Sequence, residues 1–97
     1  MKEKNVKIVN KLGLHARPAS LIVQTAMVFS SNIYIIKDET KVDAKSIMGI
    51  LMLAAAYGTE LKLQTEGPDE EQALEKMVEV FNNGFGEEIQ WNKITLF

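Results

Sequence analysis

His15 is the only histidine in the 97-residue chain and the side chain most able to change its charge or react near neutral pH. It lies in the stretch GLHARPAS, residues 13–20, behind Gly13 and ahead of Arg17 and Pro18. An imidazole can act as a metal ligand, a proton carrier or a nucleophile, so the surrounding residue types must indicate which chemistry applies.

The neighbours of His15 favour the binding of an anion. Pro18 suits the first turn of a helix, because it fixes φ and lacks an N–H that would be unpaired there in any case. A helix that begins near residue 16 presents unpaired backbone amides, and these bind anions. Gly13 lets the backbone turn closely beneath the site, and the planar guanidinium of Arg17 matches phosphate oxygens. The pattern predicts a pocket for phosphate beside a nucleophilic imidazole, with an ordinary surface histidine as the alternative.

Other chemistries fit the sequence less well. A single histidine and no cysteine supply too few nitrogen and sulfur ligands for a zinc or iron site. No serine lies in the elbow motif of a Ser-His-Asp hydrolase. We therefore expect no metal and no cofactor, whereas a phosphohistidine needs only the residues present.

Composition narrows the class of protein. The apolar fraction of 46% and charged fraction of 25% are typical of one globular domain. The formal charge of −2 argues against a general nucleic-acid binder. The first ten residues contain no long apolar run, so neither a signal peptide nor membrane insertion is expected. Together with the absence of cysteine, this indicates a cytoplasmic protein.

The spacing of apolar residues predicts alternating strands and helices. Strands are expected over 5–10, 32–37, 41–43 and 61–66, with a polar turn at 37–40. Helices are expected over 16–29, from Ser46 to about Gly58, and from about 68 to 83. The order β-α-β-β-α-β-α indicates an α+β fold, an open-faced two-layer sandwich with a four-stranded antiparallel sheet and three helices on one face.

Each helix is expected to bury one apolar stripe. The second helix should contribute Ile50 and Leu53 to the core, and the fourth strand should turn Leu61, Leu63 and Thr65 to one side. The stripes of the first and third helices are expected at Ala19, Ile22, Val23, Ala26 and Phe29, and at Leu74, Met77, Val78 and Phe81.

The segments GLHARPA and DAKSIMGI resemble the active-site and regulatory-serine segments of the HPr family, the phosphocarriers of the phosphoenolpyruvate-dependent phosphotransferase system. The resemblance covers residues from about 4 to 86. It implies that His15 accepts a phosphoryl group on Nδ1 from enzyme I and passes it to enzyme IIA domains for sugar uptake. It also implies that the backbone amides of Ala16 and Arg17 cradle the phosphoryl group and that the Arg17 side chain stabilises it.

Ser46 has two interpretations. Its residue type and position suit the N-cap of a helix. The resemblance adds regulatory phosphorylation by an HPr kinase/phosphorylase, in hosts that carry that enzyme. The family also implies that partners dock on a surface formed by Ser20, Gln24, Ile47, Met48 and Leu51.

The branch of the system stays open at the level of sequence. Met52 and Ala54 replace a serine and a glycine that are frequent in sugar-branch members, and LMLAAAYG is similar to proteobacterial members of the family, including the nitrogen-branch paralogue NPr. SIMG instead resembles the kinase-regulated sugar branch. The alternatives to sugar uptake are a nitrogen-branch regulatory phosphocarrier and a non-relay regulatory module that binds partners through the Ser46 face.

The chain is expected to consist of an HPr-like domain, residues 1–86, and a C-terminal extension, residues 87–97. The extension contains Trp91, Ile94, Leu96 and Phe97, which are apolar for a solvated tail. We expect it to add an edge strand, or to dock on a partner or a second subunit.

Overall fold

The computed structural model describes residues 1–87, and their order of elements confirms the predicted fold class. The elements are β1 (Lys2–Lys7), α1 (Ala16–Met27), β2 (Asn32–Lys37), β3 (Thr40–Asp43), α2 (Ile47–Met52), β4 (Glu60–Glu66), α3 (Glu70–Asn82) and a 3₁₀ turn, η1 (Gly84–Gly86). Within this part of the chain, no helix has the length and apolar character needed to cross a membrane.

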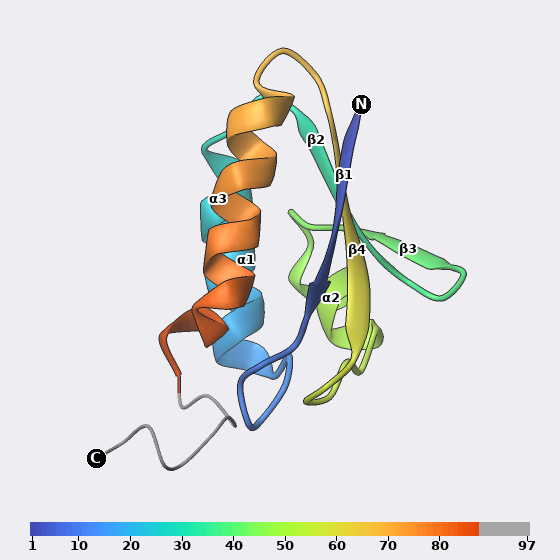
Figure 1. Ribbon diagram of the computed structural model, residues 1–97, viewed down its shortest axis with the longest axis vertical. Helices are drawn as coiled ribbons and strands as arrows, with labels where there is room; N and C mark the ends of the chain where they lie inside the picture. The colour runs from blue at the N-terminus through green and yellow to red at the C-terminus, as the bar shows by residue number, and fades with distance from the viewer. Residues whose placement is uncertain (88–97) are drawn as a thin grey trace.

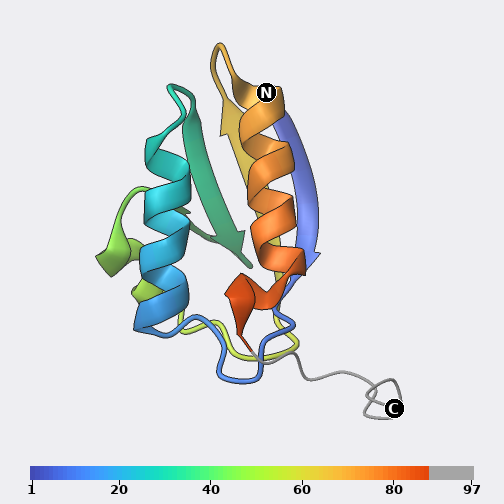
Figure 2. The same ribbon diagram turned by 90° about the vertical axis from the view of Figure 1, so that its left-hand side faces the viewer.

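The four strands form one sheet in the order β1-β4-β2-β3, and every neighbouring pair is antiparallel. The helices lie on one face of this sheet (Figure 1). Figure 2 shows α1 and α3 side by side in front of the strands and running in opposite directions. The start of α1 and the end of α3 therefore lie at the same end of the molecule, and this arrangement positions the site described below.

The core fills the space between the sheet and the helices. Leu61, Leu63 and Thr65 of β4 are buried, as the alternation predicts, and so are Ile50 and Leu53. The predicted stripes are confirmed in part, because α1 and α3 each turn a slightly different face to the sheet. The fully buried residues of α1 and α3 include Ala19, Ile22, Ala26, Ala73, Met77 and Phe81, whereas Val23, Leu74 and Val78 are only partly buried. Phe29 is also partly buried and lies beyond the end of α1 at Met27.

The prediction that the second helix continues to Gly58 is wrong. The helix ends at Met52, Leu53 forms its C-cap, and Ala54 adopts a left-handed backbone with φ of 50°. The chain then turns so that the Ala55 carbonyl accepts a hydrogen bond from the Leu14 N–H at 2.9 Å. Because this contact joins the segment to the loop before α1, tertiary pairing outweighs the helix propensity of the alanines.

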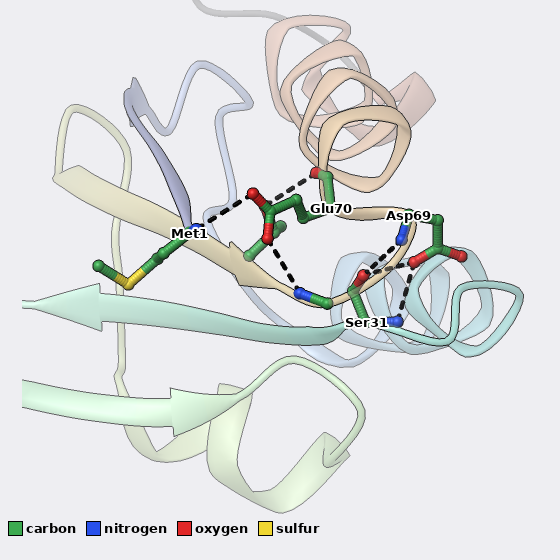
Figure 3. A network of polar contacts seen from close by, with 6 residues as sticks. Met1, Ser31, Asp69 and Glu70 are labelled. Atoms are coloured by element: carbon green, nitrogen blue, oxygen red, sulfur yellow. Dashed lines mark hydrogen bonds and ion pairs between the residues drawn. The ribbon is translucent and has the colours of Figure 1, made fainter.

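A network of polar contacts closes the opposite end of the helical layer, where α3 begins (Figure 3). The Asp69 carboxylate accepts hydrogen bonds from the Ser31 hydroxyl and from the backbone N–H groups of Ser30 and Ser31, each N–H at 2.9 Å. Glu70 forms an ion pair with the amino group of Met1 at 3.1 Å and accepts from the Gly67 N–H at 3.0 Å. These contacts tie the start of α3 to β1 and to the start of β2.

Candidate functional site

His15 is the N-cap of α1. Its backbone is extended, with φ of −83° and ψ of −170°, and its carbonyl accepts the first helical hydrogen bond, from the Ala19 N–H at 3.1 Å. Ala16 and Arg17 are the first two helical residues, and their N–H groups have no acceptor within residues 1–87. The predicted helix start is confirmed, and Pro18 lies in the first turn. The imidazole is thus placed beside free backbone donors of the kind that bind anions.

The loop before His15 depends on Gly13. This residue has a left-handed φ of 71°, and a Cβ atom there would lie 2.6 Å from the Ala55 carbonyl oxygen. The loop is held in place by two backbone hydrogen bonds, from Leu14 N–H to the Ala55 carbonyl at 2.9 Å and from His15 N–H to the Gly13 carbonyl at 3.0 Å. A side chain at position 13 would displace the backbone that presents His15.

One edge of the imidazole contacts a carboxylate. Nε2 of His15 lies 3.0 Å from Oε1 and 2.9 Å from Oε2 of Glu87. The His15 side chain is 38% exposed, whereas that of Glu87 is only 13% exposed. Nδ1 of His15 has no hydrogen-bond partner among the residues that the structure describes. The ring is therefore held at Nε2 and available at Nδ1.

Asn10 stabilises this contact through hydrogen bonds to Glu87 and to the loop before His15. Its side chain is fully buried, and Nδ2 donates hydrogen bonds to the Gly13 carbonyl at 2.8 Å and to Oε1 of Glu87 at 3.0 Å. Both partners are acceptors, so the amide nitrogen rather than its oxygen must face them. The Asn10 Oδ1 atom is buried without a partner in residues 1–87. Asn10 thus joins the His15 loop to Glu87.

The surroundings keep Glu87 ionised. Burial alone would raise the pKa of its carboxyl, but hydrogen bonds from His15 and Asn10, and the charges of His15 and Arg17, lower the pKa below its ordinary value. Glu87 also lines a surface pocket of about 390 Å³ with Lys11, Leu12 and Arg17. Among residues 1–87, the pocket beside the imidazole is therefore lined by two cations and one carboxylate.

The structure brings together His15, Ala16 and Arg17, as the sequence predicts, and adds Asn10 and Glu87, which sequence reasoning missed. Glu87 is 72 positions from His15, and nothing in its local sequence indicates the contact. The proposed boundary between the HPr-like domain and the C-terminal extension, after residue 86, stays a prediction. Glu87 is the first residue beyond this boundary, and it contacts His15. The rest of the predicted extension, and its expected edge strand or docking role, lies outside the described residues.

Ser46 is the N-cap of α2, since its Oγ accepts a hydrogen bond from the Gly49 N–H at 3.1 Å. Ile47 and Met48, which follow it, are 41% and 68% exposed, while Leu51 is partly buried against the core. On α1, the Gln24 amide donates to the Ser20 hydroxyl at 3.4 Å. Since α1 and α2 contact each other, these five side chains belong to neighbouring helices, and their role in docking stays a prediction.

Comparison with known proteins agrees with this arrangement. The family model described as "PTS HPr component phosphorylation site" matches residues 2–83. The phosphocarrier protein HPr of Treponema pallidum is 51% identical over 85 residues, which cover 88% of this chain and 97% of that protein. The HPr-like protein Crh of Halalkalibacterium halodurans is 51% identical over 78 residues, which cover 80% of this chain and 93% of that protein.

A solved structure shares the whole fold. The crystal structure of HPr-C-His from Thermoanaerobacter tengcongensis superimposes with a TM-score of 0.88 at 54% sequence identity. The match covers 92% of this chain and all of that one, 100%. The similarity therefore includes both the helix that begins at His15 and the sheet beneath it.

Proposed function

This chain belongs to the HPr family of histidine phosphocarriers of the phosphotransferase system, and on that basis we propose that Nδ1 of its His15 carries the phosphoryl group. The observation that supports this assignment is the position of His15, the only histidine, at an open helix N-terminus with Nδ1 unpartnered among residues 1–87. A phosphoryl group on this atom lies beside donors that are already in place.

The relay consists of two displacements at phosphorus. Nδ1 attacks the phosphoryl group of phosphorylated enzyme I, the N–P bond forms, and the donor leaves with the electron pair of the bond that breaks. The nucleophile of an enzyme IIA domain then attacks the same phosphorus, and the electron pair of the N–P bond returns to Nδ1. Such transfers depend mainly on alignment and charge stabilisation, so a small exposed site is sufficient.

Arg17 and the first-turn amides supply the charge stabilisation. The N–H groups of Ala16 and Arg17 have no acceptor within residues 1–87 and are assigned to the phosphoryl oxygens. The Arg17 side chain is exposed and lines the pocket beside His15, so its guanidinium can reach the phosphoryl group without leaving a buried position. We assign it to stabilisation of the group during entry and exit.

We propose the sugar-uptake branch, with enzyme I and enzyme IIA domains as partners in the cytoplasm. The relatives named phosphocarrier protein HPr support this branch, and the SIMG segment supports it as well. The alternative is the nitrogen branch, which the LMLAAAYG segment favours. Comparing the rate of phosphorylation by enzyme I of each branch distinguishes the two, because the cognate donor should react faster.

Ser46 supports a second, regulatory function. Its hydroxyl lies at a helix N-terminus, where a phosphate adds charge without opposing the helix dipole, and exposed Ile47 and Met48 follow directly. We propose that an HPr kinase/phosphorylase modifies Ser46 and that the added charge weakens docking on the Ser20, Gln24, Ile47, Met48 and Leu51 surface. The test measures the rate of phosphoryl transfer from the same enzyme I to the wild type and to Ser46→Asp. The variant should be phosphorylated more slowly if charge at this position weakens docking.

A His15→Ala variant separates the relay from a purely regulatory binding module. A relay loses all phosphoryl transfer when the imidazole is removed, whereas a module that acts through the Ser46 face keeps its partner. The measurement pairs a transfer assay with titration of the partner proteins. Full phosphorylation of His15→Ala by enzyme I would refute the assignment of His15.

A further inference from the structure

We propose that Glu87 is a positioning residue of the relay, which holds one proton on Nε2 of His15 through both phosphoryl transfers. The inference rests on the proposed function of His15 and assigns a role to a carboxylate outside the first helix. The contact itself is direct, with Nε2 at 3.0 Å and 2.9 Å from the two carboxylate oxygens.

The hydrogen-bonding partners decide where the proton is. An ionised carboxylate has only acceptor atoms, so Nε2 must be the donor in this contact. In a neutral imidazole the other nitrogen then carries the lone pair, and that nitrogen is Nδ1. Glu87 therefore selects the tautomer whose Nδ1 is able to attack phosphorus.

The same contact has a different effect once the phosphoryl group is attached. When Nδ1 forms its bond to phosphorus and Nε2 keeps its proton, the ring carries a positive charge beside the Glu87 carboxylate. This pair favours the protonated ring, in which cleavage of the N–P bond returns the electron pair to Nδ1 and releases a neutral imidazole. A ring without the Nε2 proton would have to leave as an anion, which is a much poorer leaving group. No proton needs to enter or leave in either step.

The fold keeps Glu87 in position through Asn10. Nδ2 of this buried amide donates to Oε1 of Glu87 and to the Gly13 carbonyl, so the carboxylate and the loop that presents His15 are fixed to the same group. Within residues 1–87, the other charged groups that line the adjoining pocket are Arg17 and Lys11, which are both cationic. Glu87 is consequently the one carboxylate that faces His15 among the described residues.

Two substitutions of Glu87 separate the effect of its acceptor oxygen from the effect of its negative charge. Glu87→Ala removes the acceptor, so the His15 ring should shift toward a mixture of tautomers in ¹⁵N NMR spectra. Glu87→Gln keeps an acceptor oxygen but removes the charge, so it should retain the tautomer. Glu79→Gln serves as the control, because Glu79 lies on the exposed face of α3 and pairs only with Lys76 among residues 1–87.

The second readout is the pH dependence of phosphoryl loss. In both Glu87 variants the phosphorylated ring should lose its proton at a lower pH than in wild type, so transfer to an enzyme IIA domain at pH 8 should slow by about three- to tenfold, and the difference should vanish near pH 6. A residue with only a structural role would slow transfer equally at both pH values.

The outcomes are distinguishable from failure of the proposed function. If His15 of the wild type is not phosphorylated at all, the relay assignment itself is wrong. If His15 is phosphorylated but both Glu87 variants match wild type and Glu79→Gln in tautomer and in pH dependence, the role of Glu87 is refuted while the relay stands. Circular dichroism of each variant excludes loss of the fold as the cause.

Discussion

Glu87 and His15 are 72 positions apart in the chain, yet the carboxylate of one lies within 2.9 Å of Nε2 of the other. The contact exists because α3 runs antiparallel to α1 and ends where α1 begins (Figure 2). The histidine belongs to a local motif, whereas its carboxylate partner is supplied by the fold. Four predictions concern the residues around this site and the elements that hold it.

Replacing Arg17 by alanine should slow phosphoryl transfer from enzyme I by about 100-fold, the usual effect of losing one group that stabilises transition-state charge. Arg17→Lys should recover only part of this rate, since an ammonium lacks the planar, two-pronged geometry that matches phosphate. The rate of His15 phosphorylation is measured at low protein concentration, with enzyme I as the donor and phosphoenolpyruvate as the source of the phosphoryl group. Lys62→Ala, which removes an equal charge from a solvent-exposed position of β4, serves as the control and should transfer at the wild-type rate.

Ser46 variants should separate helix capping from charge. Ser46→Ala removes the oxygen that accepts from the Gly49 N–H, so the free energy of unfolding should fall by about 1 kcal/mol. Ser46→Asp keeps a capping acceptor and should retain most of this stability, while reducing phosphorylation by enzyme I. Urea unfolding followed by circular dichroism measures the first effect and a transfer assay the second. If Ser46→Asp transfers as fast as wild type, negative charge at this position does not regulate docking.

Ala54 is strained, because it adopts φ of 50° without being glycine. Left-handed backbone costs a residue with a Cβ atom about 1–2 kcal/mol, so Ala54→Gly should raise the free energy of unfolding by up to about 1 kcal/mol after the entropy of glycine is included. Ala56→Gly is the matched control, since Ala56 is exposed in the same segment and has no positive φ. That variant should be less stable than wild type. Equal effects at both positions would contradict the assignment of strain to Ala54.

Asp69 should stabilise the fold in a pH-dependent way. The hydrogen bond from the Ser31 hydroxyl, followed by that from the Ser30 N–H, lowers the pKa of the Asp69 carboxyl below its ordinary value of 3.8. Because the folded pKa lies below the unfolded one, the stabilisation is fully present above about pH 4 and is lost as pH falls through the folded pKa. The melting temperature of Asp69→Asn should therefore lie below that of wild type at pH 7, and the gap should narrow below pH 4.

The control for Asp69 is Glu75→Gln, at an exposed position of α3 with no side-chain hydrogen bond within residues 1–87. Its melting temperature should follow wild type across the same pH range. A constant gap between Asp69→Asn and wild type from pH 7 to pH 3 would show that the carboxylate contributes no pH-dependent stability.

The sequence predicts the parts of this fold that depend on local patterns. Alternation in β4, the turn at Lys37–Thr40 and the helix start at His15 each follow from a few adjacent residues, and the structure confirms all three. These features were predictable because strand and helix periodicity, turn residues and capping act over short distances.

The features that sequence reasoning missed depend on distant contacts. The early end of α2 reflects the pairing of Ala55 with Leu14, which no local pattern reveals in an alanine-rich run. The antiparallel arrangement of α1 and α3 places Glu87 against His15, and Asn10, in the loop before α1, is joined to the site through its hydrogen bond to Glu87. A single sequence contains no signal for such pairs.

The proposed function depends on Nδ1 of His15 as the atom that carries the phosphoryl group. The most direct test is to incubate the full chain with phosphoenolpyruvate and enzyme I, locate the label by mass spectrometry and ³¹P NMR, and check its lability in acid. We expect one acid-labile phosphoryl group, bound to Nδ1 of His15 and absent from His15→Ala. A label on Nε2, on another residue, or retained in His15→Ala would show that Nδ1 of His15 is not the carrier.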